Sequence, residues 1–136
     1  MSSIVEFFIA PDDDAAAAVA GHGPDSVTEA ARYGNFDPVT TTGQWKSSFG
    51  IVRADSPRII AGDGRPLVLA VPASLQAALA AADEEQLAEA ATRWAGLPAD
   101  DGEEIHPEFA SDMLSQIASL ARIATHRRHR LYYWWG

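Results

Sequence analysis

The sequence predicts an α+β fold, in which a small, mostly antiparallel or mixed sheet with N- and C-terminal strands is packed by about four to five helices. Three observations predict it. A β-branched and aromatic segment opens the chain at residues 4–10, an aromatic segment closes it at residues 131–135, and Ala- and Leu-rich stretches with helical periodicity lie between. A length of 136 residues fits one domain, covering residues 1–136.

The first predicted strand, residues 4–10, is apolar apart from Glu6, so we expect both of its faces to be covered. Pro11 ends this strand. Asp12 is a favourable N-cap for an Ala-rich helix over residues 15–20, and Asp13 and Asp14 suit the positive end of the helix dipole.

The middle of the chain is the hardest part to interpret. Residues 26–29 carry a capping-box pattern, which predicts a short helix that ends before Gly34. Within residues 35–60, the Thr-rich stretch is a poor helix former, so we expect only one or two turns at residues 44–49, with Trp45 and Phe49 facing inward. A short apolar pair at 59–60 and a strand at 67–71 follow.

Two helices are predicted next. Ser74 is expected to cap the first, which has apolar residues up to Ala82. Asp83 and Gln86 have capping-box spacing, and they predict the start of the second. The apolar face of this second helix consists of Leu87, Ala90, Ala91 and Trp94, and Gly96 closes it.

A long amphipathic helix and a strand complete the chain. Pro107 suits the first position of the helix. Its predicted buried stripe, at three- and four-residue spacing, is Phe109, Met113, Ile117, Leu120, Ala121 and Ala124. In the strand that follows, alternation places Tyr132 and Trp134 on one face and Tyr133 and Trp135 on the other. Core packing on both faces and an exposed aromatic pair are both compatible with this pattern.

The order of these elements resembles the YfbM-like family of bacterial proteins, whose function is uncharacterised. The resemblance rests on the segment Leu75-Gln76-Ala77-Ala78-Leu79, the helix from Leu87 to Trp94, the loop Glu104-Ile105-His106-Pro107 and the long helix and strand after it. It is best from about Leu67 onward, and Trp45 would match the central tryptophan of the family. The resemblance implies an α+β fold with a mostly antiparallel sheet, and it brings no established catalytic residue.

Composition excludes several classes of function. The chain has no cysteine, which excludes disulfides, thiolate zinc sites and a cysteine nucleophile. Its net charge of −9 disfavours binding to nucleic acid. We expect no membrane span, because no apolar run approaches about 20 residues. The first three residues carry no basic side chain and Pro11 stops the apolar run, so we expect no signal peptide and a cytoplasmic location.

The first candidate site is the basic segment that precedes the last strand. It consists of His126, Arg127, Arg128, His129 and Arg130. Arginine forks bind carboxylate or phosphate, so this segment would recognise an anion or an acidic partner, aided by an exposed Tyr133 and Trp135. The alternative is a helix end whose cations only complement the helix dipole and the acids of the protein.

The second candidate site is a cleft near the end of the first strand, formed by Asp12, Asp13, Asp14 and Trp45. Helix capping is the alternative role of these aspartates. A third candidate is the acidic loop at residues 100–106, but its spacing matches no calcium or zinc pattern, so no metal and no cofactor are predicted.

Three functions remain open on the sequence alone. The first is a non-enzymatic protein-binding or regulatory domain that meets its partner through the basic segment and the last strand. The second is a small-molecule-binding protein or minor enzyme that uses the cleft. The third is a homo-oligomer whose aromatic strand pairs with a second copy. Nothing in the sequence identifies a catalytic residue.

Overall fold

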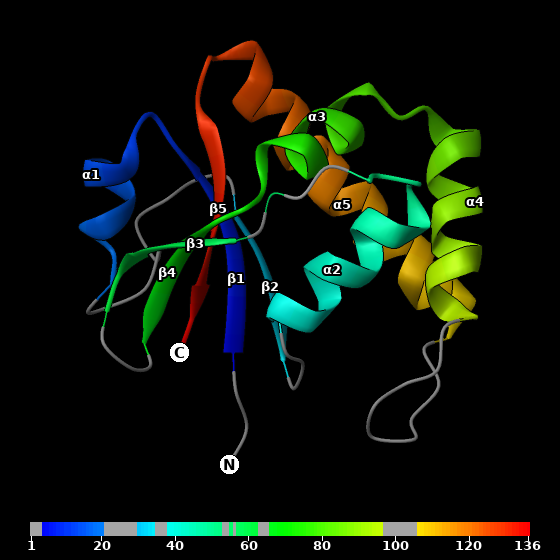
Figure 1. Cartoon of the computed structure of the whole chain (residues 1–136), viewed down its shortest axis with the longest axis horizontal. Coiled ribbons are helices and arrows are strands. Elements are labelled where there is room, and N and C mark those ends of the chain that lie inside the picture. The colour runs from blue at the N-terminus through cyan, green and yellow to red at the C-terminus, as the bar shows by residue number, and fades with distance from the viewer. Residues whose placement is uncertain are drawn as a thin grey trace.

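A five-stranded antiparallel sheet forms the centre of the structure, a computed structural model (Figure 1). The model describes residues 4–20, 30–34, 38–52, 55, 57–62, 66–96 and 106–136. The strands are β1 (Ile4–Ala10), β2 (Ala30–Gly34), β3 (Arg58–Ala61), β4 (Leu67–Ala70) and β5 (Arg130–Trp135). Their order across the sheet is β2-β1-β5-β4-β3. The described residues thus confirm the α+β class and the strands near both ends of the chain.

The two longest strands, β1 and β5, lie next to each other in the middle of the sheet. Their register places Phe7 opposite Tyr133 and Phe8 opposite Tyr132. These cross-strand pairs lie on opposite faces, with ring centroids 5.6 Å and 5.7 Å apart. Both faces of β1 are covered, as the sequence predicts, because each face carries one of these aromatic pairs into a packed layer.

The described residues contain five helices. They are α1 (Asp13–Ala17), α2 (Pro38–Ser48), α3 (Ala73–Ala81), α4 (Glu84–Ala95) and α5 (Pro107–His126). Figure 1 shows α1 on one side of the sheet and α2 to α5 on the other. The smaller core under α1 includes Phe8 and Tyr132, and the larger core under the other helices includes Phe7 and Tyr133.

Helix α5 supplies the largest contribution to the main core. Met113, Ile117, Leu120, Ala121 and Ala124 are all buried, in agreement with the predicted stripe. The prediction for Phe109 is wrong, because its side chain is 52% exposed. Phe109 stands in the first turn of α5, beside the edge strand β2, where its ring meets Tyr33 edge-on with ring centroids 6.4 Å apart.

Two predictions for the middle of the chain are wrong. The helix expected up to residue 33 is absent from residues 30–34, which pair with β1 as strand β2. There Arg32 forms an ion pair with the buried Glu6, at 3.4 Å, so the one charged residue of β1 has a partner on the neighbouring strand. The second error concerns α2, which is longer than the sequence predicts. The inward orientation of Trp45 is confirmed, since this side chain is fully buried.

The predicted helix caps are mostly confirmed. The Asp12 carboxylate accepts a hydrogen bond from the Ala15 amide at 2.8 Å, and Asp83 and Gln86 form both bonds of a capping box. The prediction for Ser74 is wrong. Pro72 occupies the N-cap position of α3 without a side-chain bond, and Ser74 is instead bonded by a distant carboxylate, that of Asp55.

Candidate functional site

The predicted basic segment lies at the turn between α5 and β5. Helix α5 ends at His126, and Arg128 follows with a left-handed backbone, at φ 58°. The amide of Arg128 donates to the Thr125 carbonyl at 3.2 Å, and the amide of His129 donates to the Ala124 carbonyl at 2.7 Å. These two bonds make a Schellman motif, which fixes the direction in which the chain leaves the helix.

A buried glutamine on α3 anchors the same turn. The Gln76 side-chain amide donates to the Thr125 hydroxyl and to the His129 carbonyl, each at 3.3 Å. Its oxygen accepts the Leu131 amide at 2.9 Å. Gln76 therefore satisfies backbone groups on both sides of the turn and ties it to the helical layer.

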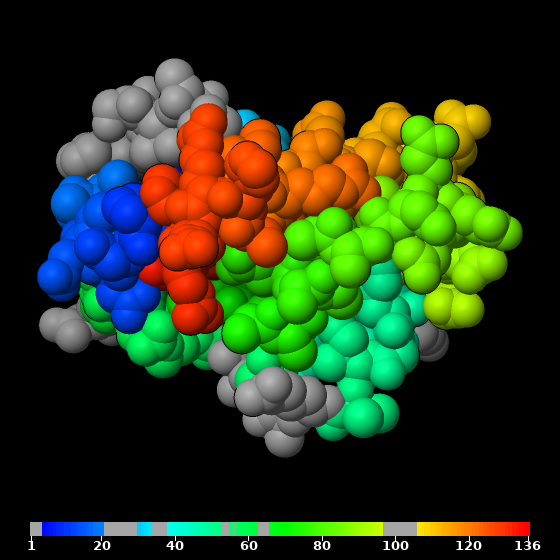
Figure 2. Space-filling model, turned by 90° about the horizontal axis from the view of Figure 1, so that it is seen from above, coloured from blue at the N-terminus to red at the C-terminus, as the bar shows by residue number. Residues whose placement is uncertain are grey.

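The structure divides the basic segment between two surfaces. His126, Arg127 and Arg128 are exposed, whereas His129 and Arg130 are half-buried. Figure 2 shows the end of α5 and the start of β5 (red) at the surface, with α1 (blue) on one side and α3 (green) on the other. Of these five residues, His126 and Arg127 line one of the hollows described next and Arg130 lines the other, whereas Arg128 and His129 line neither.

The first surface, here called the α5 hollow, has a volume of about 460 Å³ and is lined by Arg122, Ile123, His126 and Arg127. The guanidinium of Arg122 donates to the Ala82 carbonyl at 2.6 Å, which holds that side chain against the loop between α3 and α4. The hollow thus combines an aliphatic side chain with three basic side chains from the last turns of α5 and its C-cap, Arg127. Sequence reasoning missed Arg122, although its four-residue spacing from His126 places both on the same helix face.

The second surface, here called the α1 hollow, lies at the end of β1. It measures about 410 Å³ and is lined by Pro11, Asp12, Asp13, Asp14, Arg58, Arg130 and Tyr132. A hollow therefore lies at the three aspartates of the predicted cleft, and Trp45 does not line it. Trp45 lies in the main core, on the opposite side of the sheet from α1.

Asp13 occupies the centre of the polar contacts in the α1 hollow. Its carboxylate accepts the Tyr132 hydroxyl at 2.7 Å and the Arg58 guanidinium at 3.1 Å. The bond from Tyr132 outweighs the effect of burial and, with the charges of Arg58 and Arg130, lowers the pKa of Asp13. Burial and the adjacent Asp13 carboxylate in turn raise the pKa of Tyr132.

Arg58 and Tyr132 belong to this site, but sequence reasoning did not identify them. The alternation of β5 places Tyr132 on the same face as Arg130, so a signal for Tyr132 was present. The contribution of Arg58 depends on which strand pairs with β4, and the sequence does not state that pairing.

The aromatic part of the predicted partner surface is not available as predicted. Tyr133 is fully buried in the main core, and Trp135 is half-buried against the same core. Alternation along β5 puts both residues on the sheet face that the helical layer covers. Core packing on both faces of β5 is therefore the correct alternative.

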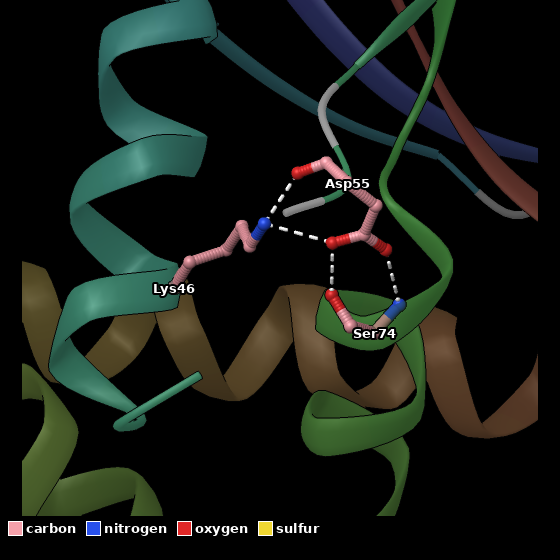
Figure 3. Close-up of polar contacts among 3 residues, drawn as sticks. All are labelled: Lys46, Asp55 and Ser74. Carbon is pink, nitrogen blue, oxygen red and sulfur yellow. Dashed lines mark hydrogen bonds and ion pairs between the residues drawn. The ribbon is translucent and has the colours of Figure 1, made fainter. Parts of the chain in front are cut away.

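A third polar cluster joins α2, α3 and the segment that precedes β3 (Figure 3). The Asp55 carboxylate accepts the Ser74 amide at 3.0 Å, the Ser74 hydroxyl at 2.5 Å and the Lys46 ammonium at 2.7 Å. Lys46 also donates to the Asp55 carbonyl. Burial alone would raise the pKa of Asp55, but the bonds from Lys46 and Ser74 outweigh it and lower that pKa.

This cluster has the chemistry of a structural connection. The Asp55 carboxylate occupies the place of a missing N-cap on α3, and Lys46 ties the same carboxylate to α2. The Ser74 hydroxyl donates to a carboxylate whose pKa is lowered by Lys46 and Ser74, so Asp55 is a poor base for activating this hydroxyl as a nucleophile. Neither of the two hollows is lined by these residues.

The acidic loop falls almost entirely outside the described residues, since only His106 of residues 100–106 is placed. There the His106 ring accepts the Glu108 amide at 3.3 Å at the start of α5. Within the part of the chain that the structure describes, no three acidic or histidine side chains gather closely enough to hold a metal ion. None of the described helices is both long and apolar enough to cross a bilayer.

No protein-family model, no curated protein and no solved structure matches this chain. The resemblance to the YfbM-like family therefore stays a prediction. The case for any function rests on the two hollows and the residues that line them.

Proposed function

We infer that this chain is a non-enzymatic binding domain that docks an acidic segment of a partner protein at the end of α5. The α5 hollow supports this proposal, because it sets three basic side chains around an aliphatic one on a chain with a net charge of −9. A partner segment that alternates acidic and apolar side chains matches this surface in charge and in polarity. A cytoplasmic location and kinship with the YfbM-like family belong to the same proposal.

The rigidity of the turn next to the hollow also supports this proposal. The Schellman motif and Gln76 hold the chain at Arg128, so little ordering is required of the backbone when a partner binds. Arg128 keeps a left-handed backbone that a glycine would adopt without steric cost. An exposed arginine at such a position is consistent with a role for its charge at the surface.

The test measures the binding of a fluorescein-labelled peptide of alternating Glu and Leu by fluorescence anisotropy. A peptide with Gln in place of Glu is the control for charge. We expect the acidic peptide to bind more tightly by about tenfold, with an affinity that falls as salt is added. Equal affinity for both peptides would refute the proposal.

Variants of the protein locate the binding face. The double variant Arg127→Ala, Arg128→Ala should bind the acidic peptide about tenfold more weakly, while a variant with lysine at both positions should retain most of the affinity. Arg93→Gln removes one positive charge from α4, outside the hollow, and should have no effect on peptide binding. If Arg93→Gln weakens binding as strongly, the attraction is nonspecific and the α5 hollow is not the site.

The homo-oligomer is the competing interpretation, and the same preparation tests it. Light scattering after size-exclusion chromatography should give the mass of one chain across the concentrations used for binding. A dimer that dissociates in the Arg127→Ala, Arg128→Ala variant would mean that a second copy, and not another protein, occupies the α5 hollow.

A further inference from the structure

The α1 hollow is independent of the α5 hollow, and its own side chains indicate what it would bind. A volume of about 410 Å³ lies in the range of small-molecule sites, which start at about 300 Å³. In Figure 2, α1 and the start of β5 lie beside each other on this face. The ligand must therefore be small, and the lining determines its chemical class.

The lining carries nearly balanced charge. Asp12, Asp13 and Asp14 face the hollow from one side, and Arg58 and Arg130 face it from the strands. Three carboxylates disfavour a nucleotide or another polyanion, and two guanidinium groups disfavour a polycation. The ligand class that suits this balance carries one negative and one positive group.

The internal contacts leave one group of each sign available. Asp13 is already bonded to Tyr132 and Arg58, and Asp12 accepts a bond from the α1 backbone. The Arg130 side chain influences Asp13 through its charge, but it makes no hydrogen bond or ion pair with another described residue. The side chain of Asp14 likewise makes none within those residues.

We propose that the α1 hollow binds a small zwitterion, an amino acid or related amino carboxylate, with its carboxylate on Arg130 and its ammonium group on Asp14. A guanidinium binds a carboxylate with two parallel hydrogen bonds, which is the strongest contact available in this hollow. The Asp13–Tyr132–Arg58 contacts are positioning contacts that hold the wall against which the ligand lies.

The experiment follows the side-chain Nε–H signal of Arg130 by NMR in isotope-labelled protein. The probes are a series of amino carboxylates from glycine to 6-aminohexanoate, each with its matched simple carboxylate and simple amine. We expect at least one amino carboxylate to shift the Arg130 signal with an affinity about tenfold above both of its analogues. A series in which the simple carboxylates bind equally well would overturn the assignment of a zwitterion, and no shift at about 10 mM would overturn the site itself.

Variants distinguish this site from general charge effects. Arg130→Gln should abolish the shifts elsewhere in the hollow, and Asp14→Asn should remove the preference for the amino carboxylate over the simple carboxylate. Asp14 is exposed, so this second variant should fold even if Arg130→Gln does not. Arg93→Gln is the control and should bind as the wild type does. Retained binding in Asp14→Asn, with its preference unchanged, would contradict the proposed role of Asp14.

Discussion

Replacing Asp55 by alanine tests the cluster that joins α2 to α3. The substitution removes the surrogate cap of α3, which is typically worth about 1 kcal/mol, and a charge-assisted bond from the Ser74 hydroxyl, worth about 1.5 kcal/mol. It also removes the ion pair with Lys46. The two side chains are only 14% and 25% exposed, but Lys46 keeps its bond to the carbonyl of residue 55, so we assign the loss of the pair about 0.5 kcal/mol. We expect Asp55→Ala to lower the free energy of unfolding by about 3 kcal/mol.

Urea unfolding, followed by the fluorescence of the four tryptophans, measures this loss. Asp55→Asn is the matched control, because its amide oxygen can still cap α3 while the charge is gone. It should lose about 1 kcal/mol. If both variants lose the same amount, or if Asp55→Ala loses less than about 0.5 kcal/mol, Asp55 does not cap α3 as described.

The pH dependence supplies a second check on the same residue. The pKa of Asp55 is lower in the folded protein, so its contribution is present above the unfolded value of about 4 and is lost as pH falls below it. The stability difference between wild type and Asp55→Asn should therefore shrink from pH 6 to pH 3. A difference that grows in acid would have the wrong sign for a stabilised carboxylate.

Three further outcomes follow from the contacts described above. Gly50→Ala should lower the free energy of unfolding in urea by about 1 kcal/mol, because Gly50 follows α2 with a left-handed backbone at φ 70°. Arg128→Gly, at the equivalent position after α5, should leave that free energy unchanged. A loss of stability in Arg128→Gly would contradict the idea that Arg128 is strained. Gln76→Leu should cost about 2 kcal/mol, because it leaves the Leu131 amide buried without an acceptor, and a neutral result would mean that another group replaces it. Tyr132→Phe should raise the pKa of Asp13 toward its ordinary value, measured by carbon NMR of the carboxyl, and an unchanged pKa would exclude Tyr132 as its main cause.

Local patterns predicted much of the fold. The caps at Asp12 and Asp83 and the start of α5 at Pro107 each depend on a few adjacent residues, and the structure confirms them. The prediction for residues 30–34 was wrong. A capping-box pattern at residues 26–29 suggested a helix, but pairing with β1 determines the conformation of residues 30–34. The length of α2 was underestimated for a related reason, because burial of Thr42 and Trp45 outweighs the low helix propensity of its threonines.

The candidate site was predicted only in part, because it depends on which strands are neighbours. The aspartates at the end of β1 were identified, but their partners Arg58 and Tyr132 come from strands whose order no local pattern states. The same order places Tyr133 inside the molecule and Arg130 in the α1 hollow, apart from His126 and Arg127 in the α5 hollow. A sequence pattern can indicate which residues carry charge, but only the sheet determines which of them meet.

The central position of β5 has a consequence for synthesis on the ribosome. Strands β1 and β2 form one antiparallel pair and β3 and β4 another, and within the sheet the two pairs are hydrogen-bonded to each other through β5, which is made after all of them. Until β5 emerges, one edge of β1 and one edge of β4 remain unpaired, and such edges invite pairing with other chains. On the ribosome, the two strand pairs therefore become one sheet only after β5 has emerged, and both edges stay open to unwanted pairing until then.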